Sequence, residues 1–152
     1  MRAIGNRIGR RGAPAPWIVA GLAAVAMTGC YWLRYGALME THVELLETMA
    51  RDGRDAVVVR VAPPVAADIT RLSYPLERAR EFAEISERFH AERTSLARFR
   101  DLLERYGELV TLLDSLRGPA VRLDEERLAE VGRVAAAVEA AAAAVRDALA
   151  VE

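Results

Sequence analysis

The sequence predicts an all-α protein, in which an N-terminal membrane-anchor helix runs into an antiparallel bundle of three to four helices. Apolar residues recur at spacings of three and four along most of the chain after residue 35, as on one face of a helix. Breakers separate these segments, most clearly Pro63-Pro64 and Gly118-Pro119. A long apolar run follows a cluster of arginines near the N-terminus, which is typical of an export or membrane segment.

Charge divides the chain into two regions. Residues 1–30 contain four arginines and no acidic residue, whereas residues 31–152 contain 17 arginines and 22 acidic residues, a net charge of −5. A mildly acidic region with interleaved signs is not expected to bind nucleic acid or an anionic membrane surface. All 21 basic residues are arginine, which we attribute to a GC-rich genome rather than to phosphate binding.

The first element is the segment at the N-terminus. Residues 1–16 form a basic cytoplasmic region, and residues 17–35 form a membrane anchor or signal segment. From Trp17 to Leu33, 17 residues carry no charge, which is the lower limit for a spanning helix. Because the arginines precede this run, the positive-inside rule places residues 36–152 on the extracytoplasmic side.

Cys30 is the only cysteine, which excludes an intramolecular disulfide and a multi-cysteine zinc site. The stretch Met27-Thr28-Gly29-Cys30 resembles the bacterial lipoprotein signal motif. This resemblance covers residues 1–30 and implies that Cys30 is acylated and becomes the new N-terminus. Met27 replaces the usual leucine, and the sequence after Cys30 is bulky where a polar tether is common. Alternatively, Cys30 is a small apolar residue within a spanning helix.

The next element is a helix over residues 35–52 that continues from the apolar run, with Gly53 as its expected end. Its apolar stripe consists of Leu38, His42, Leu45, Leu46 and Met49. The β-branched stretch 56–61 then predicts an extended connector or a frayed helix end, because no second strand is available to pair with it.

Two helices are expected between the breakers. The first begins at Ser73 and Pro75, after a short helical turn over 68–72. Its stripe is Leu76, Ala79, Phe82, Ala83, Ile85 and Phe89. The second helix has Thr94 and Ser95 as candidate caps. Its face is wide enough for a bundle core and consists of Leu96, Phe99, Leu102, Leu103, Tyr106, Leu109, Val110, Leu112, Leu113 and Leu116.

The last helix begins at Asp124, a favourable N-cap followed by two glutamates. Its heptad pattern defines a seam for a partner helix or for self-association: Leu128, Val131, Ala135, Val138, Ala142, Val145 and Leu149. An alanine buries little apolar area, so this helix should depend on neighbouring helices for its stability.

The sequence predicts no catalytic residue, no cofactor site and no metal site, and we expect a protein that is not an enzyme. Glu87 and His90 have the Glu-x-x-His spacing of di-iron bundles, but those bundles need two such motifs. A solvated helix face explains the pair better. His42 lies on an apolar stripe and is expected to be a partly buried, hydrogen-bonded histidine.

The predicted function is therefore that of a membrane-tethered, extracytoplasmic helical bundle in a bacterial cell envelope. Its expected partners are the membrane and another protein, or a second copy of the chain bound through helices. The alternative is a ligand-sensing helical ectodomain that signals through a partner protein.

Overall fold

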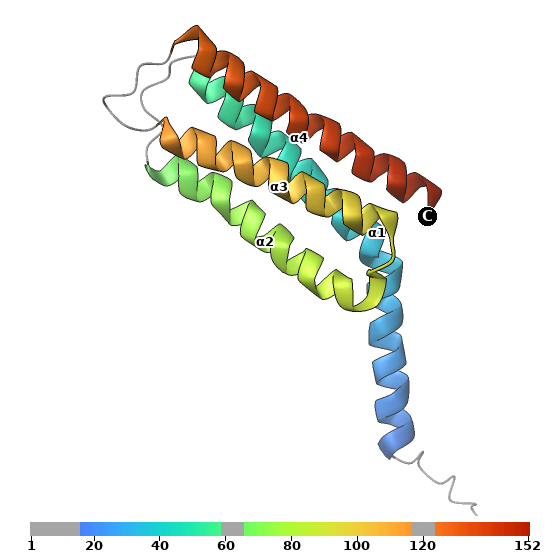
Figure 1. The fold of residues 1–152 in the computed structure, drawn as a ribbon. Coiled ribbons are helices and arrows are strands. Elements are labelled where there is room, and N and C mark those ends of the chain that lie inside the picture. The colour runs from blue at the N-terminus through green and yellow to red at the C-terminus, as the bar shows by residue number, and fades with distance from the viewer. Residues whose placement is uncertain (1–15, 59–65, 117–123) are drawn as a thin grey trace, which may run out of the picture. The chain divides into compact units, whose positions relative to one another are not determined.

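A computed structural model describes the backbone of residues 16–58, 66–116 and 124–152, and the side chains of residues 34–57, 69–116 and 124–152. These residues form four helices: α1 (Pro16–Val58), α2 (Ala66–His90), α3 (Thr94–Ser115) and α4 (Glu125–Val151) (Figure 1). The chain has two compact units, residues 1–34 and 35–152. The second unit is an all-α four-helix bundle, as the sequence predicts.

Side-chain contacts show that neighbouring helices run in opposite directions. Along α1, Tyr35 lies against His90 of α2, and His42 lies against Phe82, so residue numbers rise on one helix and fall on the other. The same order holds between α2 and α3 (Leu72 with Tyr106, Glu87 with Arg100) and between α1 and α4 (Glu47 with Arg146, Arg51 with Glu139). Because α3 also packs against α4, the bundle has an up-down-up-down arrangement.

The core of the bundle is largely aliphatic, with a few aromatic rings. Its largest fully buried side chains are Tyr35, Tyr106, Phe99, Met39, Leu46, Leu96, Leu102 and Leu109. The wide apolar face predicted for α3 is confirmed, since its leucines and aromatic residues are buried and Val110 and Leu112 pack against the core. A face of this width can contact helices on both sides, and α3 contacts both α2 and α4.

The predicted end of helix α1 is wrong. Helix α1 does not end at Gly53 but continues to Val58. Gly53 is buried, and a Cβ atom there would lie 2.8 Å from Cδ1 of Leu113 and 3.7 Å from Cδ1 of Leu72. The glycine therefore permits close packing of α1 on α2 and α3 instead of ending the helix. Residues 56–58 of the predicted extended connector or frayed helix end are therefore helical. Residues 59–61 lie outside the described residues.

Helix α2 does not begin at Ser73 and Pro75, because it already starts at Ala66 and contains Pro75 in its interior. Proline has no backbone N–H and interrupts the helical hydrogen bonds of the preceding turn. In the same turn, the Tyr106 hydroxyl of α3 donates a hydrogen bond of 2.9 Å to the Leu72 carbonyl. Burial raises the pKa of Tyr106, which keeps the hydroxyl protonated as a donor.

The starts of α3 and α4 differ in how well local sequence predicts them. Asp124 is the N-cap of α4, as predicted, and its Oδ1 accepts a 2.9 Å hydrogen bond from the backbone N–H of Arg127. The cap predicted for α3 is wrong, because Thr94 and Ser95 lie inside the helix and Arg93 is the N-cap residue without a side-chain hydrogen bond. Helix α3 ends at Ser115 with Leu116 as its C-cap, just before the predicted breaker Gly118-Pro119.

Candidate functional site

The predicted seam of α4 lies inside the chain's own bundle. Five of its members, Val131, Ala135, Val138, Ala142 and Val145, are at most 1% exposed. Leu128 and Leu149, at the two ends of the seam, are partly buried against the same core. A partner that used these side chains would have to displace α1 or α3, so we looked for a candidate contact surface elsewhere.

Cys30, the lipidation candidate, falls on a part of α1 whose side chains lie outside the described residues. The same holds for the rest of the apolar run from Trp17 to Leu33. Where the structure describes the chain in full, no helix has the length and apolar character needed to cross a membrane.

Both histidines contact aromatic rings rather than the acidic groups of a metal site. The ring of His90 is centred 4.2 Å from that of Tyr35, and the ring of His42 is centred 5.0 Å from that of Phe82. Burial and the charge of Arg78 lower the pKa of His42. Burial and Arg93 also lower the pKa of His90, although Glu152 acts in the opposite direction.

The Glu-x-x-His spacing does not bring its two side chains together. His90 is 3% exposed and faces the core, whereas Glu87 has a side chain that is 52% exposed and forms an ion pair of 2.5 Å with Arg100 of α3. Among the residues whose side chains are described, no cluster of three or more histidine, cysteine or acidic residues is placed to hold a metal ion.

Polar groups meet at the end of the bundle where α3 begins. The Glu152 carboxylate accepts hydrogen bonds from the backbone N–H of Ser95 at 3.0 Å and from its hydroxyl at 2.6 Å. The same hydroxyl lies 3.0 Å from the Tyr35 hydroxyl, and the Arg93 guanidinium lies over the Tyr35 ring. Burial raises the pKa of Glu152, but the Ser95 hydrogen bonds and Arg93 outweigh it, so the net pKa is lowered. The cluster ties α1 and α4 to the start of α3, and its groups contact one another, which favours a structural role.

Exposed apolar side chains line the outer edge of the interface between α1 and α2. Leu38 and Leu45 are 40% and 41% exposed, and Ile85 and Phe89 are each 48% exposed. Leu38 and Leu45 lie four and three positions from His42, and Ile85 follows Phe82 by three positions, so they share the side of each helix where His42 meets Phe82. We call these four residues the α1–α2 apolar face.

All four residues belong to apolar stripes predicted from the sequence, and their predicted burial is wrong. The buried residues of α1 include Tyr35, Met39, Val43 and Ala50, and those of α2 include Ser86 and His90, so the buried face of each helix is turned relative to its predicted stripe. Periodicity gives the direction of an apolar face to within about one position, and a shift of that size moves the outer members of the stripe to the surface.

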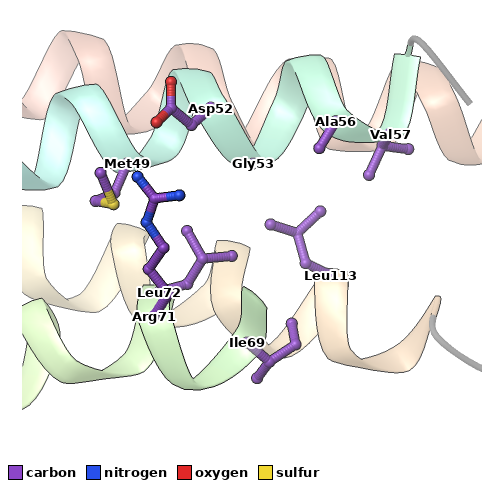
Figure 2. Close-up of a pocket in the computed structure, with 9 residues that line it drawn as sticks. All are labelled: Met49, Asp52, Gly53, Ala56, Val57, Ile69, Arg71, Leu72 and Leu113. Atoms are coloured by element: carbon purple, nitrogen blue, oxygen red, sulfur yellow. The ribbon is translucent and has the colours of Figure 1, made fainter. Parts of the chain in front are cut away.

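A cavity of about 160 Å³ lies between α1, α2 and α3, beside Gly53 (Figure 2). Its floor consists of buried residues: Met49, Gly53, Val57, Leu72 and Leu113. Ile69 is half-buried in its wall, and the exposed residues Asp52, Ala56 and Arg71 lie at its mouth. Figure 2 shows the Arg71 guanidinium reaching from α2 toward α1, and the Ala56 side chain directed toward the space above Leu113.

The sequence predicts neither the α1–α2 apolar face nor the cavity beside Gly53. The cavity depends on Gly53, which the sequence predicts to be a helix end, and on three helices that meet around it. No protein-family model, curated protein or solved structure shows significant similarity to this chain.

Proposed function

We propose that the chain is a protein-interaction module that is held at the extracytoplasmic side of a bacterial membrane and binds an amphipathic helix of a partner protein on its α1–α2 apolar face. The observation that carries this proposal is that Leu38, Leu45, Ile85 and Phe89 are each at least 40% exposed. Their spacing places them on the side of α1 and α2 where His42 meets Phe82. Exposed apolar side chains that group on a surface mark interaction sites.

A helix is the partner element that fits this edge best. Two antiparallel neighbouring helices present a groove between their ridges, and a third helix can lay its own ridge into that groove. A bound amphipathic helix presents apolar anchors, spaced at three, four and seven positions, to the groove that receives it. Leu38 and Leu45 on α1, and Ile85 and Phe89 on α2, supply exposed apolar side chains for such anchors to contact.

The opposite interface of α1 has different chemistry. Where α1 meets α4, Glu47 forms ion pairs with Arg51 and Arg146, and Glu139 forms ion pairs with Arg51 and Arg54. These charges pair within the chain, so this edge offers a partner helix little apolar surface. Of the two edges of α1, the α2 side is therefore the better candidate for docking.

The membrane location in the proposal is supported by the sequence alone. The arginines at positions 2, 7, 10 and 11 precede the apolar run, and the acidic residues follow it. Intact mass of the membrane-extracted protein tests this part. A diacylglyceryl adduct with loss of residues 1–29 would identify a lipid anchor on Cys30, and an uncleaved N-terminus would identify a spanning helix. Full-length protein that stays in the soluble fraction would contradict both.

Site-specific photo-crosslinking in cells tests the docking surface. A photoreactive amino acid at Ile85 should give an adduct that mass spectrometry maps to an amphipathic helix of another protein. The same amino acid at Ala136, an exposed position of α4, serves as the matched control and should give no such adduct. Leu45→Glu should abolish the adduct at position 85 because it places a charge in the apolar contact.

Three results would overturn this proposal. The first is an absence of any adduct at position 85, and the second is an equal adduct at position 136. The third is an adduct that maps to a second copy of the chain, which would replace the partner protein by self-association.

A further inference from the structure

We propose that the cavity beside Gly53 is a binding site for a small, uncharged apolar molecule of about the size of benzene. The site is separate from the α1–α2 apolar face, and the inference stands whether or not that face binds a partner helix. It rests on the size of the cavity, on the chemistry of its walls and on the glycine that keeps it open.

The volume of the cavity limits the size of the ligand. The cavity has a volume of about 160 Å³. An apolar protein cavity of roughly 150 Å³ stays dry and accepts benzene or xenon, whereas drug-sized ligands need about 300 Å³ or more. The space therefore matches one aromatic ring or a short alkyl chain in size.

The apolar side chains that line the cavity favour an uncharged ligand. Val57, Leu72 and Leu113 form the buried floor and offer only methyl and methylene groups, and Met49 adds a polarizable thioether. A charged group placed among them would lose its hydration without gaining a hydrogen bond. The charged side chains of Asp52 and Arg71 are exposed and lie at the mouth rather than in the buried floor. Figure 2 shows the Asp52 carboxylate directed away from the cavity.

Gly53 keeps the space open. A Cβ atom at this position would lie 2.8 Å from Cδ1 of Leu113, so an alanine would force this lining side chain to shift. Glycine inside a helix costs about 1 kcal/mol relative to alanine. Gly132 provides a matched comparison, because a Cβ atom there would meet nothing within 4 Å.

Methyl NMR of the full-length protein tests the proposal, with benzene as the probe. The expected result is a saturable chemical-shift change in the methyl groups of Val57, Leu72 and Leu113, while the methyl groups of Leu103 and Val145, which do not line the cavity, stay unchanged. A local and saturable response separates binding in the cavity from partitioning of benzene into a lipid or detergent. Shifts that never saturate, or that spread over all methyl groups, would overturn the proposal.

Ala56→Leu should weaken benzene binding at least about tenfold, because a leucine extending from this position occupies the space that the ring needs. The control is Ala136→Leu, which places the same side chain on an exposed part of α4 and should bind benzene as the unchanged protein does. If Ala56→Leu does not fold, Gly53→Ala and Gly132→Ala form a second matched pair, of which only the first should weaken binding. Equal binding by both members of the folded pair would refute the site.

Discussion

The ion pair between Glu47 of α1 and Arg146 of α4 should contribute measurably to stability. Glu47 Oε2 accepts a 2.6 Å hydrogen bond from Arg146 Nη2, and Glu47 Oε1 lies 2.7 Å from Arg51 Nη2. The Glu47 side chain is only 13% exposed, whereas the Arg146 side chain is 35% exposed. A charged hydrogen bond contributes about 1.5–3 kcal/mol when well buried, and an exposed ion pair contributes roughly 0.2–1 kcal/mol.

The Glu47–Arg146 pair is partly buried, so its contribution to the free energy of unfolding should lie between these two ranges. Glu40 forms a second ion pair with Arg146, at 3.7 Å, and it compensates in part when Glu47 is removed. We therefore expect a coupling energy of about 1 kcal/mol in a double-mutant cycle of Glu47→Ala and Arg146→Ala. The assay is urea unfolding of the full-length protein, monitored by far-ultraviolet circular dichroism under identical conditions for all four proteins.

The exposed pair between Arg78 and Glu81 of α2 is the matched control. Its distance is similar, at 2.8 Å, but its side chains are 58% and 61% exposed. A cycle on this pair should give a coupling energy below about 0.5 kcal/mol. If the two cycles give the same coupling energy, burial of Glu47 does not strengthen its ion pair and the reasoning is refuted.

Three further predictions use the same unfolding assay. Tyr106→Phe should lower the free energy of unfolding by about 1 kcal/mol, because the Leu72 carbonyl loses its hydrogen bond from the Tyr106 hydroxyl. Tyr74→Phe is the control: Tyr74 is 62% exposed, and its substitution should have almost no effect. Gly132→Ala should raise the free energy of unfolding by about 0.5–1 kcal/mol, since alanine favours the helix and an added Cβ atom meets nothing; a destabilised variant would contradict this. Stability should fall from pH 8 to pH 5.5, because the folded pKa values of His42 and His90 are lowered and the unfolded chain binds protons first, from about pH 6.5 downward. Replacing both histidines by glutamine should flatten this dependence, and an unchanged slope would show that other groups cause it.

The sequence predicted those features of the bundle that depend on local chemistry or on a strong period. Asp124 is the N-cap of α4 because an N-cap is made by a side chain and a backbone N–H three residues apart. The apolar face of α3 is predicted because its leucines and aromatic residues recur at helical spacing without a break. In each case, all the information lies within one segment of the chain.

The predicted helix boundaries are wrong at positions where residues distant in sequence pack against the helix. Gly53 and Pro75 are breakers by local preference, yet both lie inside helices. Tertiary contacts lie beside both positions: Leu72 and Leu113 pack closely on Gly53, and Tyr106 of α3 donates a hydrogen bond to the Leu72 carbonyl in the turn before Pro75. A propensity of about 1–3 kcal/mol can be overcome by packing of this kind.

The sequence by itself determined that the chain after residue 35 is an all-α bundle and that its N-terminal segment has the pattern of an anchor. Periodic apolar residues must be buried by some neighbour, whatever that neighbour is. Only the tertiary structure decided which apolar residues are buried. It placed the α4 seam in the core, left Leu38 and Ile85 on the surface, and formed a cavity beside Gly53. Those outcomes depend on how helices distant in sequence pack together, and a period of 3.6 residues does not encode the identity of the facing helix.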